Sequence, residues 1–134
     1  MASLSLEIIT PERLLLKAEV SSVKAPGSIG YLGVLPGHAP LITPLKAGVV
    51  TYKDGGSEKK VAVSGGFLEA GATRVIILAD TAEKAEEIDV ERARKALERA
   101  ENRLSERAPD LDVARAEAAL KRAEARLKAA GAKH

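Results

Sequence analysis

The chain changes character just after Asp80, and this change limits the folds that are open to it. Before Asp80, short runs of Val, Ile and Leu are separated by Gly and Pro, a pattern typical of a small all-β unit. After it, Ala, Glu, Arg and Lys dominate, and these residues are among the best helix formers. We therefore expect two units, with a boundary between Asp80 and Glu87.

Six segments of the first unit predict strands. Asp54-Gly55-Gly56 separates two of them and is a strong hairpin signal. Val75 to Ala79 is a continuous apolar run, which favours a strand that is buried on both faces. Several short strands with frequent turns imply a sandwich or a barrel. The expected strands are Ser3 to Ile9, Ala18 to Ala25, Val49 to Lys53, Lys60 to Ser64, Phe67 to Ala70 and Arg74 to Ala79.

The second unit carries the start and stop signals of two helices. Asp89 is a plausible N-cap for a first helix that runs to about Glu106. Asp110 or Asp112 can cap a second helix, and Gly131 is a reasonable stop. Two helices joined by a short connection form a hairpin.

The two predicted helices carry matching apolar seams with steps of three and four residues. Because four of the ten seam residues are alanine, closing the hairpin buries little apolar area, and the hairpin should open easily. The seams are Val90, Ala93, Leu97, Ala100 and Leu104 in the first helix, and Val113, Ala116, Leu120, Ala123 and Leu127 in the second.

Three arginines of the second unit, Arg99, Arg122 and Arg126, have no acidic residue three or four positions away. They therefore need partners from outside their helices. An antiparallel hairpin would bring them together with Arg92. Either they are solvated or reach carboxylates of the β unit, or they form a site for a polyphosphate.

Composition excludes several other functions. A net charge of +2 and an aromatic content of 2% argue against nucleic-acid binding. The absence of cysteine excludes disulfides and a thiolate nucleophile, and no apolar run is long enough to span a membrane, so we expect a cytoplasmic-type chain that is not membrane-inserted. The glycines at 27, 30 and 33 lack the lysine of a phosphate loop, and Ser64 has no histidine placed to activate it. We expect no catalytic residues and no metal.

Two motifs resemble one family. They are GYLGVLPGHAPL from Gly30 to Leu41 and SGGFLE from Ser64 to Glu69, and the helical tail follows them. Together they are similar to the epsilon subunit of bacterial F-type ATP synthase, in order and over essentially the full length. This resemblance implies an α+β chain: an N-terminal, ten-stranded, antiparallel β-sandwich over residues 1–84 and a C-terminal antiparallel two-helix hairpin over residues 85–134.

The same resemblance implies a non-catalytic subunit of the central stalk, peripheral at the cytoplasmic face of the cell membrane. The sandwich would pack on the gamma subunit and rest on the polar loops of the ring of c subunits, coupling rotation to a proton-translocating enzyme. Tyr31, His38 and Ile42 are the implied contacts with the ring. Many relatives have Glu at the position of Tyr31, so an acid-to-base contact there is not implied for this chain.

The family also has a nucleotide-binding motif, which stands here as Ile88-Asp89-Val90-Glu91-Arg92-Ala93. The resemblance implies ATP as a regulatory ligand: bound ATP keeps the hairpin folded on the sandwich, and without ATP the hairpin extends beside gamma, meets the beta and alpha subunits and inhibits hydrolysis. The implied ATP-binding residues are Glu83, Ile88, Asp89, Arg92, Ala93, Arg99, Arg122 and Arg126.

Two alternatives remain open from the sequence. One is a free-standing nucleotide-sensing protein in which the helices form a lid over the ligand. The other is a homo-oligomeric coiled-coil protein that pairs through the seams, although two heptads are short for this.

Overall fold

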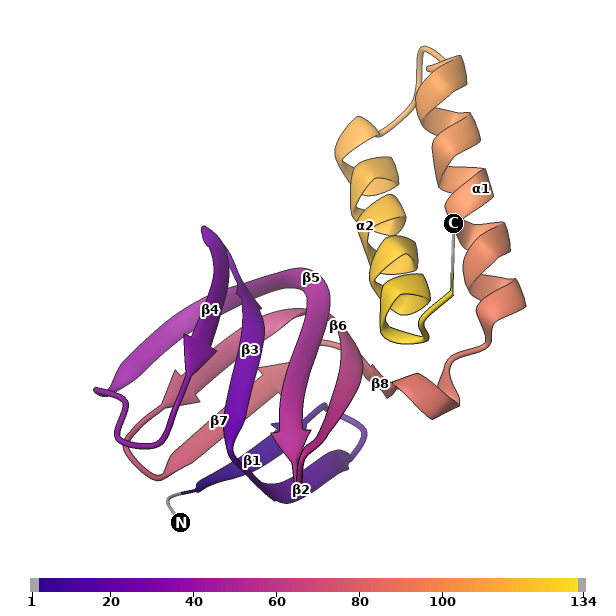
Figure 1. Cartoon of the computed structure of the whole chain (residues 1–134). Coiled ribbons are helices and arrows are strands. Elements are labelled where there is room, and N and C mark those ends of the chain that lie inside the picture. Colours follow the sequence, from indigo (N-terminus) through magenta and orange to yellow (C-terminus); the bar gives the residue numbers. More distant parts are fainter. Residues whose placement is uncertain (1–2, 133–134) are drawn as a thin grey trace.

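The computed structural model describes residues 3–132, in which a two-layer β-sandwich is followed by two antiparallel helices (Figure 1). The ends of both expected units, residues 1–2 and 133–134, lie outside the described residues. The elements are β1 (Leu4–Ile9), β2 (Leu14–Val20), β3 (Ser22–Gly27), β4 (Gly30–Val34), β5 (Leu41–Asp54), β6 (Ser57–Ala70), β7 (Arg74–Ala79), β8 (Ala82–Lys84), a 3₁₀ helix (Ala85–Glu87), α1 (Val90–Glu106) and α2 (Val113–Ala129).

The two layers are joined because β5 and β6, each 14 residues long, run through both of them. The first layer contains β2, β1, β7, the end of β6 and the start of β5. The second contains β4, β3, the end of β5, the start of β6, and β8. If each half of a long strand is counted separately, the described residues give the ten strands of the family. The pairing is antiparallel throughout this part of the chain except between β1 and β7, which are parallel.

Alternate residues of the strands point between the layers and form the core. Leu6 and Ile8 of β1, Ile77 of β7, and Val50 and Val61 of the long strands are fully buried there. The tight turn from β5 to β6 places both Gly55 and Gly56 at positive φ, 59° and 87°, as the predicted hairpin requires. The sandwich is therefore a single packed core, as the fold class predicted.

Three expectations for individual strands were wrong. The segments Lys60 to Ser64 and Phe67 to Ala70 are parts of one strand, β6, because the strand continues through Gly65 and Gly66 and stays paired with β5 on both sides of them. The segment from Ala18 to Ala25 is two strands, because the chain bends at Ser21, whose N–H donates to the Lys53 carbonyl at 2.9 Å. The run from Val75 to Ala79 is buried on one face only, since Leu78 is 53% exposed on the outside of the first layer. The apolar side chains from Val75 to Ala79 therefore lie partly in the core and partly on the protein surface.

The helices begin and end where the capping signals predicted. Asp89 and Asp112 each accept a hydrogen bond from the backbone N–H three residues on, at 3.1 and 3.0 Å. At the end of α2, Gly131 adopts φ 74°. Its N–H bonds the Lys128 carbonyl, and that of Ala132 bonds the Leu127 carbonyl, which completes a Schellman motif.

The predicted seams meet in the hairpin. Ala93 and Leu97 of α1 pack with Ala123 and Leu127 of α2 in a small apolar cluster. The apolar seams of α1 and α2 thus pack against each other, as their spacing indicated.

Gly66 is the position at which the sandwich tolerates a side chain least. Its φ is 125°, and a Cβ there would meet the Leu78 carbonyl oxygen at 2.0 Å. We predict that Gly66→Ala lowers the free energy of unfolding by about 3–5 kcal/mol, measured by urea denaturation. Gly33→Ala is the matched control, because a Cβ there meets nothing within 4 Å, and its effect should stay within about 0.5 kcal/mol. Equal effects of the two changes would contradict this account.

Candidate functional site

The hairpin touches the sandwich through a small apolar contact. α2 packs on β5 and β6, and α1 packs on α2, so one helix carries the attachment (Figure 1). The cluster at this contact is made of Val49 and Ala62 from the sandwich, Ile88 from the linker, and Ala125 and Ala129 from α2. Three of these five side chains are single methyl groups. The area removed from water is correspondingly small, and the attachment is weak for a 17-residue helix.

An ion pair between Arg126 and Glu83 supplements the apolar contact. Arg126 Nε lies 2.6 Å from Glu83 Oε1, and both side chains are about one-third exposed, at 32% and 34%. Glu83 belongs to β8 and pairs with Ala62 across the sheet, so the ion pair lies beside the apolar cluster. Arg126, which has no partner on its own helix, thus reaches a carboxylate of the β unit.

A polar cavity of about 420 Å³ opens next to this ion pair, between β8, the linker and both helices. It brings together six of the eight predicted ATP-binding residues and adds Glu87 and Ala96. The predicted residues in its wall are Glu83, Asp89, Arg92, Ala93, Arg99 and Arg126.

The other two predicted residues lie beside this cavity. Arg122 lines a small adjoining cavity together with Glu83 and Arg126. Ile88 is buried in the apolar contact with Val49 and does not line the polar cavity in this state. The hydrophobic member of the motif therefore attaches the linker to the sandwich here.

Sequence reasoning missed Glu87, which fixes the linker before α1. Its carboxylate accepts the Lys84 backbone N–H at 2.9 Å and pairs with Arg13, from the turn between β1 and β2, at 3.0 Å. The Lys84 N–H, assisted by the Arg13 guanidinium, lowers the pKa of Glu87 below its ordinary value. The interactions of the Glu87 carboxylate with Lys84 and Arg13 therefore stabilise the fold at neutral pH, and this stabilisation is lost as the pH falls through the lowered pKa of Glu87. Its one sequence signal is an acidic residue directly before the motif.

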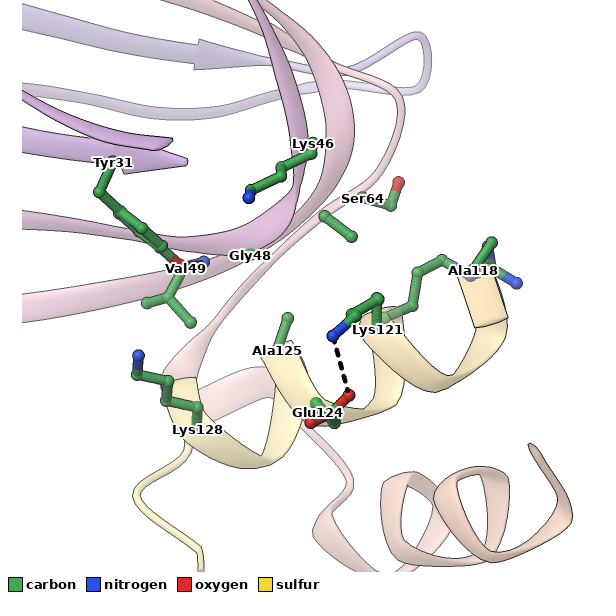
Figure 2. A pocket seen from close by; sticks show the side chains of 12 residues that line it. Tyr31, Lys46, Gly48, Val49, Ser64, Ala118, Lys121, Glu124, Ala125 and Lys128 are labelled. Atoms are coloured by element: carbon green, nitrogen blue, oxygen red, sulfur yellow. Dashed lines mark hydrogen bonds and ion pairs between the residues drawn. The ribbon is translucent and has the colours of Figure 1, made fainter. Parts of the chain in front are cut away.

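Of the three predicted ring contacts, Tyr31 faces the helical hairpin, whereas His38 and Ile42 do not line the groove beside α2. Tyr31 of β4 faces α2: its hydroxyl accepts the Val49 N–H at 3.0 Å, and Lys128 Nζ lies 5.7 Å from its ring centroid. His38 lies in the loop between β4 and β5, with Nδ1 2.6 Å from the Ala39 carbonyl oxygen. Ile42 is 72% exposed at the start of β5. Of the three, Tyr31 lines the groove beside α2 that Figure 2 shows.

The outer face of the first layer carries an apolar row across five strands. The register aligns one residue of each strand directly beside the next, so that all five point outward. Phe67 and Leu78 in this row are more than half exposed. An exposed apolar row of this kind is typical of a surface that packs against another protein. The row is Leu14, Ile9, Leu78, Phe67 and Pro44.

The described residues hold neither a helix long and apolar enough to cross a membrane nor a group of three acidic or histidine side chains suited to a metal ion. The fold and the cavity together define a non-enzymatic type of architecture in two parts: a β-sandwich with an exposed apolar face, and a helical hairpin that lines a polar cavity beside it.

Comparison with known proteins identifies the family. Residues 3–85 match the family model of the ATP synthase delta/epsilon chain beta-sandwich domain, and residues 86–131 match that of its long alpha-helix domain. The ATP synthase epsilon chain of Moorella thermoacetica is 74% identical over 133 residues, which are 98% of this chain and 99% of that one. That of Carboxydothermus hydrogenoformans is 59% identical over 128 residues, 96% of each chain. The chain belongs to the family of ATP synthase epsilon chains, which are non-catalytic subunits.

A solved structure shares the whole arrangement. A chain of the Euglena gracilis mitochondrial ATP synthase, in a structure of OSCP, F1 and the c-ring, superposes with a TM-score of 0.82 at 31% identity. The match covers 97% of this chain and 82% of that one. It therefore includes the hairpin as well as the sandwich.

The weak attachment of α2 generates a prediction. Ala125→Glu would bury a carboxylate against Val49 and Ala62, and we expect α2 to detach while the sandwich stays folded. Amide hydrogen exchange should then accelerate by tenfold or more throughout α2, for an opening cost lowered by about 1.4 kcal/mol or more, and stay unchanged in β1 and β7. Ala114→Glu, on the exposed side of the first turn of α2, is the control. Uniform acceleration in both units would show that they unfold together and contradict the account.

Proposed function

We propose that the chain is a subunit of the central stalk of F-type ATP synthase whose hairpin regulates ATP hydrolysis according to bound ATP. The observation that carries this proposal is the way α2 is held: by a few methyl groups and by one ion pair, at the edge of a cavity lined with arginines. A helix held so lightly responds to a ligand that binds one of its two positions better than the other.

ATP fits the charges around the cavity. Arg92, Arg99 and Arg126 would hold the phosphates, with Arg122 beside them, and each charge-assisted hydrogen bond supplies about 1.5–3 kcal/mol before ordering costs. Glu83 and Asp89 would accept hydrogen bonds from the base or ribose. Since Arg126 already pairs with Glu83, a phosphate would compete with that carboxylate for the guanidinium. Ile88 would need to leave its apolar contact to flank the base, so ATP binding would rearrange the linker.

Without ATP, the hairpin would leave the sandwich and extend beside the gamma subunit. The basic side chains of α2 would then meet acidic surfaces of the beta and alpha subunits and block rotation in the hydrolytic direction. ATP would favour the folded hairpin and permit hydrolysis. The folded hairpin is held by a small contact, which favours a reversible switch.

The sandwich would supply the mechanical role. Its apolar row is suited to a permanent protein partner, for which gamma is the candidate, and the loop that holds His38 would meet the c-ring loops. The related Euglena chain comes from an assembly of F1 with the c-ring. This role makes the chain peripheral at the cytoplasmic face of the membrane.

The alternatives have less support. A free-standing sensor has no use for an apolar row on the side of the sandwich away from the hairpin. A coiled-coil oligomer would need the seams, whose residues Leu97 and Leu127 are buried within the hairpin of one chain.

ATP binding is tested by calorimetry on the full chain. We predict that Arg99→Ala weakens ATP binding at least tenfold, because it removes one charge-assisted contact to phosphate. Arg103→Ala, one turn further along α1 and outside the cavity, should leave the affinity unchanged. If both variants bind ATP with equal affinity, the nucleotide binds outside this cavity. If the full chain does not bind ATP at millimolar concentration, the proposed ATP-sensing role is wrong.

Inhibition is tested in the assembled enzyme. We predict that a chain ending at Glu87, which keeps β8 and the sandwich, still assembles and raises the ATPase rate several-fold at low ATP. The comparison is with the same complex that carries the full chain, measured by steady-state hydrolysis. An unchanged rate in a fully assembled complex would refute inhibition and leave the stalk role intact.

A further inference from the structure

A second cavity, of about 520 Å³, lies between α2 and the bend of β5 (Figure 2). We call it the lysine groove. It is separate from the polar cavity beside Glu83, with which it shares no lining residue. Its charged lining residues are Lys46 from β5, and Lys121, Arg122, Glu124 and Lys128 from α2.

The lysine groove carries an excess of positive charge. Four cations face one carboxylate, Glu124, whose Oε1 atom is buried without a hydrogen bond and lies 3.9 Å from Lys121 Nζ. Within the part of the chain that the structure describes, Lys46 and Arg122 have no ion-pair partner. Like charges gathered around one cavity repel one another, and an anion in the cavity relieves that repulsion.

The spacing of the cations selects the kind of anion. Lys121 and Lys128 are seven residues apart on α2, which is about 10 Å along the helix axis. Lys46 approaches from the opposite wall, as Figure 2 shows. A chain of two or three phosphates has more oxygen atoms and more negative charge than a single phosphate, so it can contact cations on both walls of the lysine groove at once.

Tyr31 gives the lysine groove a fixed wall and one further donor. Its hydroxyl accepts the Val49 N–H at 3.0 Å, so the hydroxyl proton remains available to a ligand oxygen. The ring is held closely, because a Cβ on Gly48 would lie 2.7 Å from the hydroxyl oxygen. Lys24 and Lys128 lie 5.4 and 5.7 Å from the ring centroid, so cations surround the ring.

We propose that the lysine groove binds a chain of two or three phosphates and thereby clamps the hairpin to the sandwich. The ligand joins Lys46 of the sandwich to the cations of α2, so it stabilises the folded hairpin independently of the polar cavity. Inorganic tripolyphosphate and the tail of a nucleoside triphosphate share this chemistry. Arg122, which also lines the small cavity beside Glu83 and Arg126, connects the two sites.

Calorimetry on the full chain in magnesium-free buffer tests the site with tripolyphosphate as the probe. Lys46→Ala should weaken binding about tenfold, the loss of one charge-assisted contact. Lys46 is exposed, and circular dichroism checks that the variant is folded. Glu124→Gln, which removes the competing carboxylate, should strengthen binding several-fold. Orthophosphate should bind at least tenfold more weakly than tripolyphosphate, and equal affinity would overturn the proposal.

Arg99→Ala separates this site from the proposed ATP site, because Arg99 lines the polar cavity and not the lysine groove. The part of tripolyphosphate binding that Lys46→Ala weakens should survive Arg99→Ala. If tripolyphosphate binding is lost with Arg99→Ala and unchanged by Lys46→Ala, the phosphates bind in the polar cavity and the lysine groove is not a site. ATP is the second probe. ATP binding that Arg99→Ala weakens supports the proposed ATP site, whatever the effect of Lys46→Ala. ATP binding that Lys46→Ala weakens and Arg99→Ala leaves unchanged supports the lysine groove and contradicts the proposed ATP site.

Clamping is read from the position of the hairpin. The chain has no cysteine, so Ser57→Cys and Ser105→Cys introduce two unique sites for labels, one at the first residue of β6 and one near the tip of the hairpin. Saturating tripolyphosphate should narrow the distribution of distances between the labels, measured by electron spin resonance, and Lys46→Ala should abolish the narrowing. Binding without any change in the distribution would overturn the clamp.

Discussion

The contact between α2 and the second layer of the sandwich is small, and what the hairpin can do depends on this. Ala125 and Ala129 contribute one methyl group each, and Val49 and Ala62 offer little more. Larger side chains here would make a permanent two-unit protein. Because the apolar contact is weak, small contributions can shift the equilibrium between the attached and the detached hairpin. The Arg126–Glu83 ion pair is one such contribution, and an anion bound by the neighbouring arginines and lysines would be another.

Local signals in the sequence predicted the hairpin well. The helix caps at Asp89, Asp112 and Gly131 are formed by hydrogen bonds between residues close together in the sequence. They can therefore be predicted without knowledge of the tertiary structure. The strands depend on distant partners. The bend at Ser21 follows from its bond to Lys53, and the exposure of Leu78 depends on which face the other layer covers. No pattern of period two contains that information.

The same distinction applies to the candidate site. The lack of a local partner for Arg126 indicated that its partner lies elsewhere in the fold, but the choice of Glu83 rests on the pairing of β8 with β6. Glu87 was missed because its partner Arg13 is 74 residues away. Six of the eight residues that the resemblance to a family named line one cavity, and two do not. Arg122 lines the adjoining cavities, and the position of Ile88 depends on how closely the linker packs on the sandwich.

The most direct test of the weak attachment is a double-mutant cycle on the ion pair, read by the amide hydrogen exchange of α2. Glu83→Gln and Arg126→Gln should each raise the exchange rate of α2, because each leaves the other side chain without its partner across the interface. The double variant should exchange no faster than the faster single variant. If the two effects add fully, the residues do not interact across the interface, and the account of how the hairpin is held is wrong.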